Sequence, residues 1–293
     1  MIKAEIVAHS LSLQGDELIS VLCTFPRIVL AEVNTHRMLS KNTSSSRAIP
    51  IRKMIKAVLD NPCIPIAFQK EHTGMQGFEY LPSDLPVSLG TFTDIMMEVF
   101  KYEQEEIEEE SYDENIANIL IELLDTSIEG SPKKTLVEWW LYCRDQAVKT
   151  AILMSALGVT KQLCNRLLEP FMWTTMLITG SKEGWDNFFS LRCSSYEWEY
   201  EEGVIKAKSK EEFLEMFIQR YPTNGEKELH DWEAVDEHFN PVDSNFWRSI
   251  NEGQAEIHMM MLSEKIYDAI QESVPIQLKP NEWHIPMIKI IED

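Results

Sequence analysis

Apolar and polar residues alternate near the start of the chain, as they do in a strand with one buried face. The apolar positions are Ile19, Val21, Cys23 and Phe25. This alternation, together with several β-branched residues before it, predicts strands that close a sheet. Pro26 follows, and proline fits a first helical turn because its missing N–H has no partner there. We therefore predict a short helix after Pro26, with Val29, Val33 and Arg37 on one face.

The remaining pattern predicts mostly helices, with one further strand. Helical spacing or capping residues mark residues 51–60, 91–126, 133–157, 160–169, 181–192 and 254–270. Thr160 and Ser181 are predicted N-caps, because a short side-chain oxygen can accept from the first free N–H groups of a helix. Residues 171–179 read as a strand, and Pro170 should end the helix before it. These elements predict an α+β fold, a mixed sheet with long packed helices.

The segment 195–253 differs in composition from its surroundings. It is polar and rich in aromatic residues, with turn signals at Pro222, Gly225 and Pro241. We predict a single domain over residues 1–293, with an inserted lobe over 195–253. The lobe would form either a lid or oligomer contact, or a small structural subdomain, built around Trp198, Trp232 and Trp247.

Composition narrows the class of protein. At 293 residues and 44% hydrophobic, the chain can bury a substantial core. A formal net charge of -21 argues against a general nucleic-acid surface, which needs clustered Lys and Arg. Five cysteines without a C-x-x-C pair indicate free thiols in a reducing compartment, so we predict a cytoplasmic protein. We expect neither secretion nor membrane insertion, because the required apolar runs are missing from the sequence.

The stretch T-H-R-M-L-S-K-N-T-S-S-S-R-A-I-P is the first candidate site. It places basic residues around a run of hydroxyls, namely His36, Arg37 and Arg47 around Thr43, Ser44, Ser45 and Ser46. Short side chains let a backbone approach an anion, and an arginine can direct two N–H groups onto phosphate oxygens. The stretch therefore predicts a phosphate site. The structural alternative is a serine-rich turn with an ordinary surface arginine.

Two later segments combine arginine with apolar side chains. In N-R-L-L-E-P, Arg166 would lie opposite part of the apolar set, and Glu169 could brace it. In W-D-N-F-F-S-L-R, Asn187 and Leu191 share a helix face, with Arg192 beside them. An amide and a guanidinium against an apolar wall suit a planar heterocycle. The structural alternatives are a solvent-facing arginine and an ordinary helix core.

Other motifs are excluded by spacing. The histidines show no H-E-x-x-H or paired Cys/His pattern, so we expect no metal site. The sequence has neither G-x-G-x-x-G nor a P-loop, which argues against a Rossmann site and a Walker NTPase.

Taken in order, these segments resemble motifs of the flavin-dependent thymidylate synthases. That family carries R-H-R followed by x-x-S-x-N-E-x-S-x-R-Y, and the matching residues here are His36, Arg37, Ser40, Asn42, Ser45 and Arg47. The segment G-V-T-K-Q-L-C-N-R-L-L-E-P looks like the one whose arginine, here Arg166, reaches the nucleotide. G-Q-A-E-I-H at 253–258 resembles the start of the family's last helix. S-S-S-R-A-I-P, G-M-Q at 74–76 and E-W-H-I-P at 282–286 are similar to a divergent branch.

The chain also departs from the family pattern. Thr35, Thr43 and Ala48 stand where the motif has Arg, Glu and Tyr. The segment that normally precedes the motif and contacts flavin has no counterpart within residues 1–34, and residues 195–253 look additional.

The resemblance implies methylation of dUMP to dTMP in a homotetramer, with bound FAD, methylenetetrahydrofolate as carbon donor and NADPH as reductant. It implies that the phosphate and nucleotide are held by Ser44, Ser45, Arg47, Arg166 and Arg192. It implies that the flavin is contacted by His36, Arg37, Asn187 and Leu191. Within these sets, the catalytic residues would be Ser45, Arg47 and Arg192.

Two alternatives remain open. The changes at Thr43 and Ala48 are compatible with hydroxymethylation, or with a cytosine base, on the same cofactors. The missing upstream segment is compatible with a non-catalytic homologue that binds a nucleotide and has lost flavin. A purified protein without flavin colour would favour the second alternative.

Overall fold

The computed structural model describes residues 1–70, 79–87, 134–200, 203–220 and 241–287. Contacts divide the chain into two units, each treated by itself below. The first comprises Met1–Ile66, Glu71–Phe78 and Ala147–Asp293, and the second Ala67–Lys70 and Glu79–Gln146. In the second unit the described elements are β4 (Phe68–Gln69), β5 (Tyr80–Leu81), β6 (Pro86–Val87), β7 (Lys134–Thr135) and the start of α5 (Leu136–Ala156).

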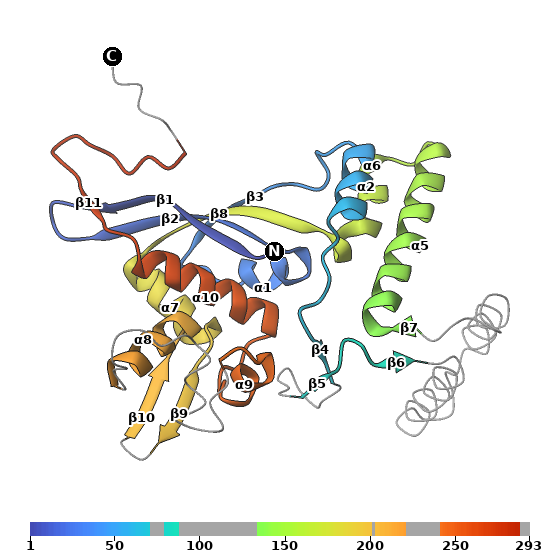
Figure 1. Cartoon of the computed structure of the whole chain (residues 1–293). Helices are drawn as coiled ribbons and strands as arrows, with labels where there is room; N and C mark the ends of the chain where they lie inside the picture. Colours follow the sequence, from blue (N-terminus) through green and yellow to red (C-terminus); the bar gives the residue numbers. More distant parts are fainter. Residues whose placement is uncertain (71–78, 88–133, 201–202, 221–240, 288–293) are drawn as a thin grey trace, which may run out of the picture. The chain divides into compact units, whose positions relative to one another are not determined.

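A five-stranded mixed sheet forms the centre of the first unit (Figure 1). Its order is β11-β1-β2-β8-β3, with β1 (Lys3–Leu11), β2 (Glu17–Pro26), β3 (Ser40–Thr43), β8 (Trp173–Ser181) and β11 (Ile276–Gln277). Strand β11 runs parallel to β1, whereas the other neighbouring pairs are antiparallel. The sheet and its helices confirm the predicted mixed α+β arrangement.

One face of this sheet carries the hydrophobic core. The alternating residues of β2 are all buried, as predicted: Ile19, Val21, Cys23 and Phe25. Strand β8 pairs Ile178 with Val21 and Met176 with Cys23, so both strands turn apolar residues to the same side. Helices α7 (Lys182–Arg192) and α10 (Ile257–Gln271) cover that side (Figure 1).

Several helices begin where the sequence predicts. Thr160 caps α6 (Lys161–Cys164), and its side chain accepts from the N–H of Gln162. Ser181 caps α7 and accepts from the N–H of Gly184. The predicted helix 51–60 is α2 (Ile51–Asp60). The other described helices that lie entirely in the first unit are η1 (Arg27–Val29), α1 (Leu30–Asn34), η2 (Asn165–Phe171), α8 (Lys210–Arg220), α9 (Ser244–Ser249) and α10.

Two local predictions were wrong, and one strand was not predicted. The helix after Pro26 ends at Asn34, so Arg37 lies outside it and is exposed. Pro170 does not end a helix, because the α-helix already stops at Cys164 and continues as the 3-10 helix η2, which contains Pro170. The sequence predicts no strand at the S-K-N-T residues of β3. They form an edge strand instead, because backbone pairing with β8 needs no apolar alternation.

Residues 195–253 contain a second hydrophobic cluster, and we call their described part the lobe. Strands β9 (Tyr196–Tyr200) and β10 (Gly203–Ala207) pair beside α8 and α9. The buried residues are Tyr196, Ile205, Ala207, Phe213, Phe217, Phe246 and Trp247, with Trp198 packed against them. This packing buries Trp247 and places the partly buried Trp198 against the same cluster, which favours the structural interpretation of these side chains.

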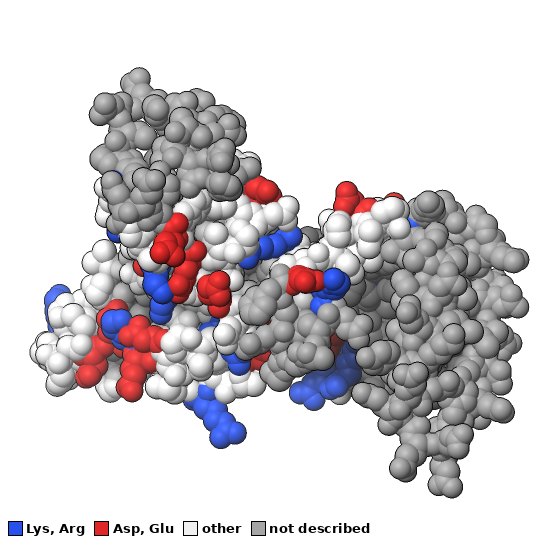
Figure 2. Space-filling view, turned by 90° about the horizontal axis from the view of Figure 1, so that it is seen from below, with Lys and Arg blue, Asp and Glu red and all other residues white. Residues whose placement is uncertain are grey.

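Some predicted features fall outside the described residues, namely the helix 91–126, the G-M-Q stretch and Trp232. Among the helices that the structure does describe, none combines the length and apolar character needed to cross a membrane. On the face seen in Figure 2, described acidic and basic side chains lie interspersed.

The orientation of β8 is testable with neighbouring residues. Ile178→Ala should lower the free energy of unfolding by about 2–5 kcal/mol, because Ile178 is fully buried among the core side chains. Leu177→Ala removes a similar side chain from the opposite, half-exposed face and should cost less than about 2 kcal/mol. Urea unfolding measures both, and equal losses would contradict this assignment of faces.

Candidate functional site

Arg192, at the end of α7, and His36, in the turn after α1, form the first cluster of predicted site residues. Arg192 Nε lies 3.0 Å from His36 Nε2. The imidazole is buried, and its ring meets Phe188 edge-on at a centroid distance of 4.8 Å. Because an arginine N–H can only donate, Nε2 must accept. His36 is therefore the neutral tautomer with its proton on Nδ1.

The neutrality of His36 has an electrostatic cause. Burial, and after it the positive charges of Arg192 and Lys41, lower the pKa of His36 to about 4. A neutral imidazole can orient the guanidinium without neutralising it. Within the described chain no carboxylate forms an ion pair with Arg192, so its terminal N–H groups remain able to bind an anion or a polar ring edge. Glu32 lies within electrostatic reach, and burial followed by Glu256 raises the pKa of its carboxyl group.

The turn that carries His36 is fixed on both sides. Lys41 Nζ donates to the carbonyl oxygens of Val33 at 3.4 Å and Asn34 at 3.3 Å, and also to that of His36. On the other side, Leu39 packs into space that glycine leaves open on β8. A Cβ atom at Gly180 would collide with Leu39 Cδ2. A Cβ atom at Gly184, in the first turn of α7, would lie 3.3 Å from the carbonyl oxygen of Met38. The turn therefore approaches both the end of β8 and the start of α7 closely.

Asn165, at the start of η2, organises the second cluster. It is fully buried, and its Nδ2 donates to the carbonyl oxygens of Ser46 and Ile49, both at 2.8 Å. Lys161 Nζ donates to the carbonyl of Ala48 at 3.2 Å. These bonds fasten the S-S-S-R-A-I-P loop onto the N-R-L-L-E-P segment.

Glu169 serves this loop and not Arg166, which corrects our prediction. Its Oε1 accepts from Ser46 Oγ at 2.6 Å and lies 3.3 Å from Arg27 Nη2. Arg27 Nη1 in turn donates to the carbonyl of Ser44 at 3.4 Å. The carboxylate is therefore occupied by groups that hold the backbone, and Arg166 is left to point outward.

The second cluster presents Arg47 and Arg166 from adjoining segments. Both arginines are exposed, and within the described residues neither forms an ion pair. Ser45 is also exposed, whereas the Ser44 hydroxyl accepts from the N–H of Thr175 at 3.3 Å. Exposed, unpaired guanidinium groups on a fixed loop suit a phosphate ligand.

Strand β3 joins the two clusters. Ser40 pairs with Thr179, beside the Gly180 contact of the first cluster, and Thr43 pairs with Met176, next to the loop of the second. At about 3.3 Å per residue, roughly 10 Å of strand separates these ends.

The remaining predicted residues flank the first cluster. Asn187 and Leu191 share one face of α7, as predicted, and both are exposed, opposite the buried core side of the helix. Arg37 is exposed beside His36. Their roles toward a flavin stay predictions.

Sequence reasoning missed the groups that hold the site, namely Asn165, Arg27 and Lys41. Asn165 and Arg27 contact segments distant in sequence, whereas Lys41 binds backbone carbonyls five to eight residues before it. A carbonyl is present at every residue, so no side-chain pattern marks these contacts. The position of Asn165 directly before Arg166 was the one available signal.

Other features of the described residues lie apart from this chemistry. A cavity of about 650 Å³ lies between α2 and the end of α5, and none of the predicted site residues line it. No group of three or more His, Cys, Asp or Glu in the described ranges could hold a metal ion.

Comparison with known proteins does not assign this chain to a family, so its function is argued from the residues described above. No protein-family model matches the sequence, and no curated protein matches it either. Two crystal structures of the UMP/dUMP methylase PolB from Streptomyces cacaoi, bound with 5-Br UMP and 5-Br dUMP, align with TM-scores of 0.36 and 0.37. Both are 11% identical and cover 87% of this chain and 97% of their own. Similarity at this level decides neither fold nor function.

The neutral state of His36 predicts a pH dependence of stability. Its folded pKa of about 4 lies below the ordinary 6.5, so the unfolded chain binds more protons between these values. Stability should therefore fall as the pH is lowered from about 6.5 to about 4. His36→Gln keeps an acceptor for Arg192 but cannot titrate. The free energy of unfolding, measured across this range, should fall less steeply in the variant; parallel curves would refute the assignment.

The role of Asn165 predicts a large effect from a small change. Asn165→Asp removes both donors and buries a charge against carbonyl oxygens, so unfolding should become easier by roughly 2–4 kcal/mol. The same amide-to-acid change at exposed Asn187 should stay within about 0.5 kcal/mol. Chemical denaturation compares the two variants, and similar effects would show that Asn165 does not fasten the loop.

Proposed function

We propose that the protein is an enzyme that methylates dUMP to dTMP, using FAD, methylenetetrahydrofolate and NADPH. The observation that carries the proposal is the Arg192–His36 pair, a charged guanidinium fixed by a neutral partner. The supporting observation is the resemblance of the segments around both residues to the motifs of flavin-dependent thymidylate synthases. As that resemblance implies, the active form would be a cytoplasmic homotetramer.

The charge distribution suits a small anion better than a nucleic acid. The chain has a formal net charge of -21, so an anionic ligand must meet a local concentration of positive charge. Arg47 and Arg166 supply it at one end of β3, and Arg192 at the other. In the proposed site Arg47 and Ser45 hold the phosphate, while Arg166 and Arg192 address the rest of the nucleotide.

The donor set around His36 also fits a flavin. Arg37 and Asn187 are exposed, and in the described chain neither side chain has a polar partner. A guanidinium suits a pyrophosphate, and an amide suits the hydrogen-bonding edge of a ring. Because Nε2 of His36 is occupied by Arg192, only its Nδ1–H remains for a ligand. When bound, FAD would supply the redox chemistry that the side chains lack.

The protein's own residues would then act by position and charge. A guanidinium held at Arg192 can donate to a carbonyl of the pyrimidine and stabilise negative charge that develops on it. Neutral His36 holds that guanidinium without competing as a cation. The loop fastened by Asn165 fixes the phosphate and, with it, the distance between phosphate and base.

A second candidate reaction is hydroxymethylation, or the same chemistry on a cytosine nucleotide. Thr43 and Ala48 favour it, because they stand where the resembling motif carries Glu and Tyr. Mass spectrometry of products from dUMP and dCMP, each with the folate and NADPH, distinguishes the reactions. A non-catalytic homologue would give no product with either nucleotide and would purify without the visible absorbance of flavin.

Removing the exposed arginines tests the nucleotide site. Arg47→Ala and Arg166→Ala should each weaken dUMP binding by roughly ten- to a hundredfold, because each removes charge-assisted hydrogen bonds. Arg220→Ala, the same change at an exposed position of α8, is the matched control and should bind as the parent does. Calorimetric titration measures the affinities, and parental affinity in both site variants would reject the assignment.

A further inference from the structure

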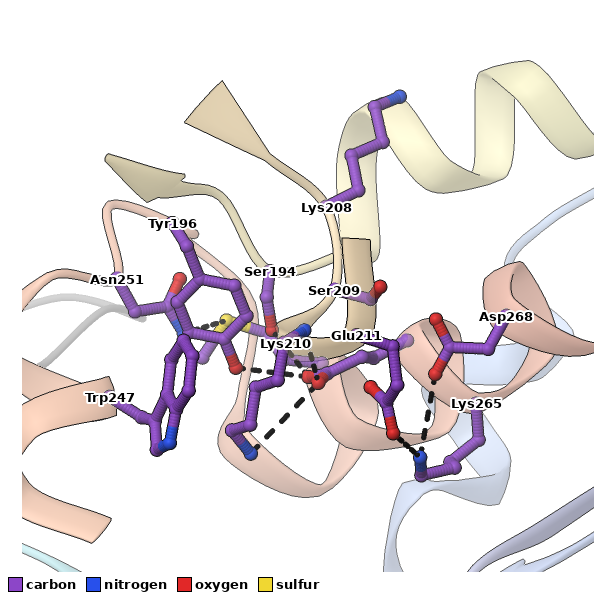
Figure 3. Close-up of polar contacts among 12 residues, drawn as sticks. Ser194, Tyr196, Lys208, Ser209, Lys210, Glu211, Trp247, Asn251, Lys265 and Asp268 are labelled. Carbon is purple, nitrogen blue, oxygen red and sulfur yellow. Dashed lines mark hydrogen bonds and ion pairs between the residues drawn. The ribbon is translucent and has the colours of Figure 1, made fainter. Parts of the chain in front are cut away.

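Glu264 is a buried carboxylate to which none of the chemistry above assigns a role. It lies on α10, and its side chain is 4% exposed. It accepts from Ser194 Oγ at 3.2 Å, from Tyr196 Oη at 3.0 Å and from the N–H of Lys210 at 3.1 Å (Figure 3). Lys210 Nζ lies 3.9 Å away. One carboxylate thus gathers β9 and the start of α8 onto α10.

The chain leaving Arg192 is fastened at each of its next residues. Cys193 Sγ donates to the carbonyl of Lys208 at 3.1 Å. Ser194 binds Glu264, as above. The N–H of Ser195 donates to Asn251 Oδ1 at 3.0 Å, and its carbonyl accepts from the N–H of Glu252 at 2.8 Å. The partners come from the lobe and from α10, so the end of α7 cannot rotate without breaking these bonds.

The helix that provides Glu264 is itself rigidly placed. Its neighbours Leu262 and Ile266 are fully buried in the core of the first unit. At the other junction, a Cβ atom on Gly253 would lie 2.8 Å from Met260 Sδ and 3.1 Å from the carbonyl oxygen of Cys193. The lobe is therefore packed tightly against both α10 and the exit of α7.

We propose that Glu264, through Ser194 and the lobe that it anchors, is a positioning residue that holds Arg192 in its bond to His36. This inference rests on the proposed function only for the ligand of Arg192, which is taken to be a nucleotide. It assigns the lobe a role that needs neither a lid nor an oligomer contact. The lobe fixes the C-terminal end of α7, as His36 fixes the guanidinium.

Two variants test this proposal in the full-length protein. Glu264→Gln removes the charge from the buried acceptor, and Ser194→Ala removes the bond closest to Arg192. In both, the pKa of His36, followed by NMR, should rise above about 4 and stay below 6.5, because Arg192 no longer lies against the ring whereas burial, the larger cause of the lowered pKa, remains. The affinity for dUMP should fall about tenfold. Circular dichroism verifies folding, and if Glu264→Gln fails to fold, Ser194→Ala decides.

The matched control is Glu211→Gln. Glu211 is an exposed acid on α8 that accepts from Nζ of Lys265, on α10, at 2.8 Å. It should leave both the His36 titration and the dUMP affinity unchanged. A folded Glu264→Gln or Ser194→Ala protein that loses thermal stability but keeps the parental His36 titration would overturn the proposal and leave Glu264 purely structural. If the parent itself does not bind dUMP, the proposed function fails, while the His36 titration still tests the positioning role.

Discussion

Strand β8 is the constraint on which the candidate site depends, because it is paired on both edges. Its long antiparallel pairing with β2 fixes the register of the core, with Val21 opposite Ile178. The same strand carries β3 on its other edge, from Thr179 to Met176. A shift of one residue would turn the apolar set of β8 away from α7 and α10. The register that buries the core thereby also fixes where the two arginine clusters lie.

The parts of the fold that could be predicted from sequence are those that depend on the spacing of residues close together in the chain. The alternation of β2 has one physical cause, the period of the strand, and Ser181 caps α7 because its oxygen needs only N–H groups a few residues away. The burial of the aromatic side of α7 and the exposure of Asn187 and Leu191 follow from the helical repeat in the same way. Each of these features is decided within a few residues.

The parts that could not be predicted depend on distant partners. β3 has polar side chains and becomes a strand through its backbone, once β8 lies beside it. Asn165 binds carbonyl groups more than a hundred residues away, and a carbonyl carries no side-chain identity that a sequence could reveal. The partner of Glu169 was predicted locally as Arg166, but tertiary packing supplies Arg27 and Ser46. Long-range contacts of this kind decide the geometry of the site, whereas local motifs indicate only which residues belong to it.

The arginines of the site and the nearby carboxylates have different partners. An acidic chain can bind an anion only where its arginines form no ion pairs with its own carboxylates, because each such pair cancels the positive potential that attracts the anion. Here the group that holds Arg192 is neutral, namely the His36 imidazole. The loop is held by the Asn165 amide together with the charged side chains of Arg27, Lys161 and Glu169. Glu169 and Glu264 bind serine hydroxyls and not the site arginines: Glu169 accepts from Ser46, and Glu264 accepts from Ser194. This arrangement fixes the frame with strong charge-assisted bonds while it leaves the positive charge of the site free for a ligand.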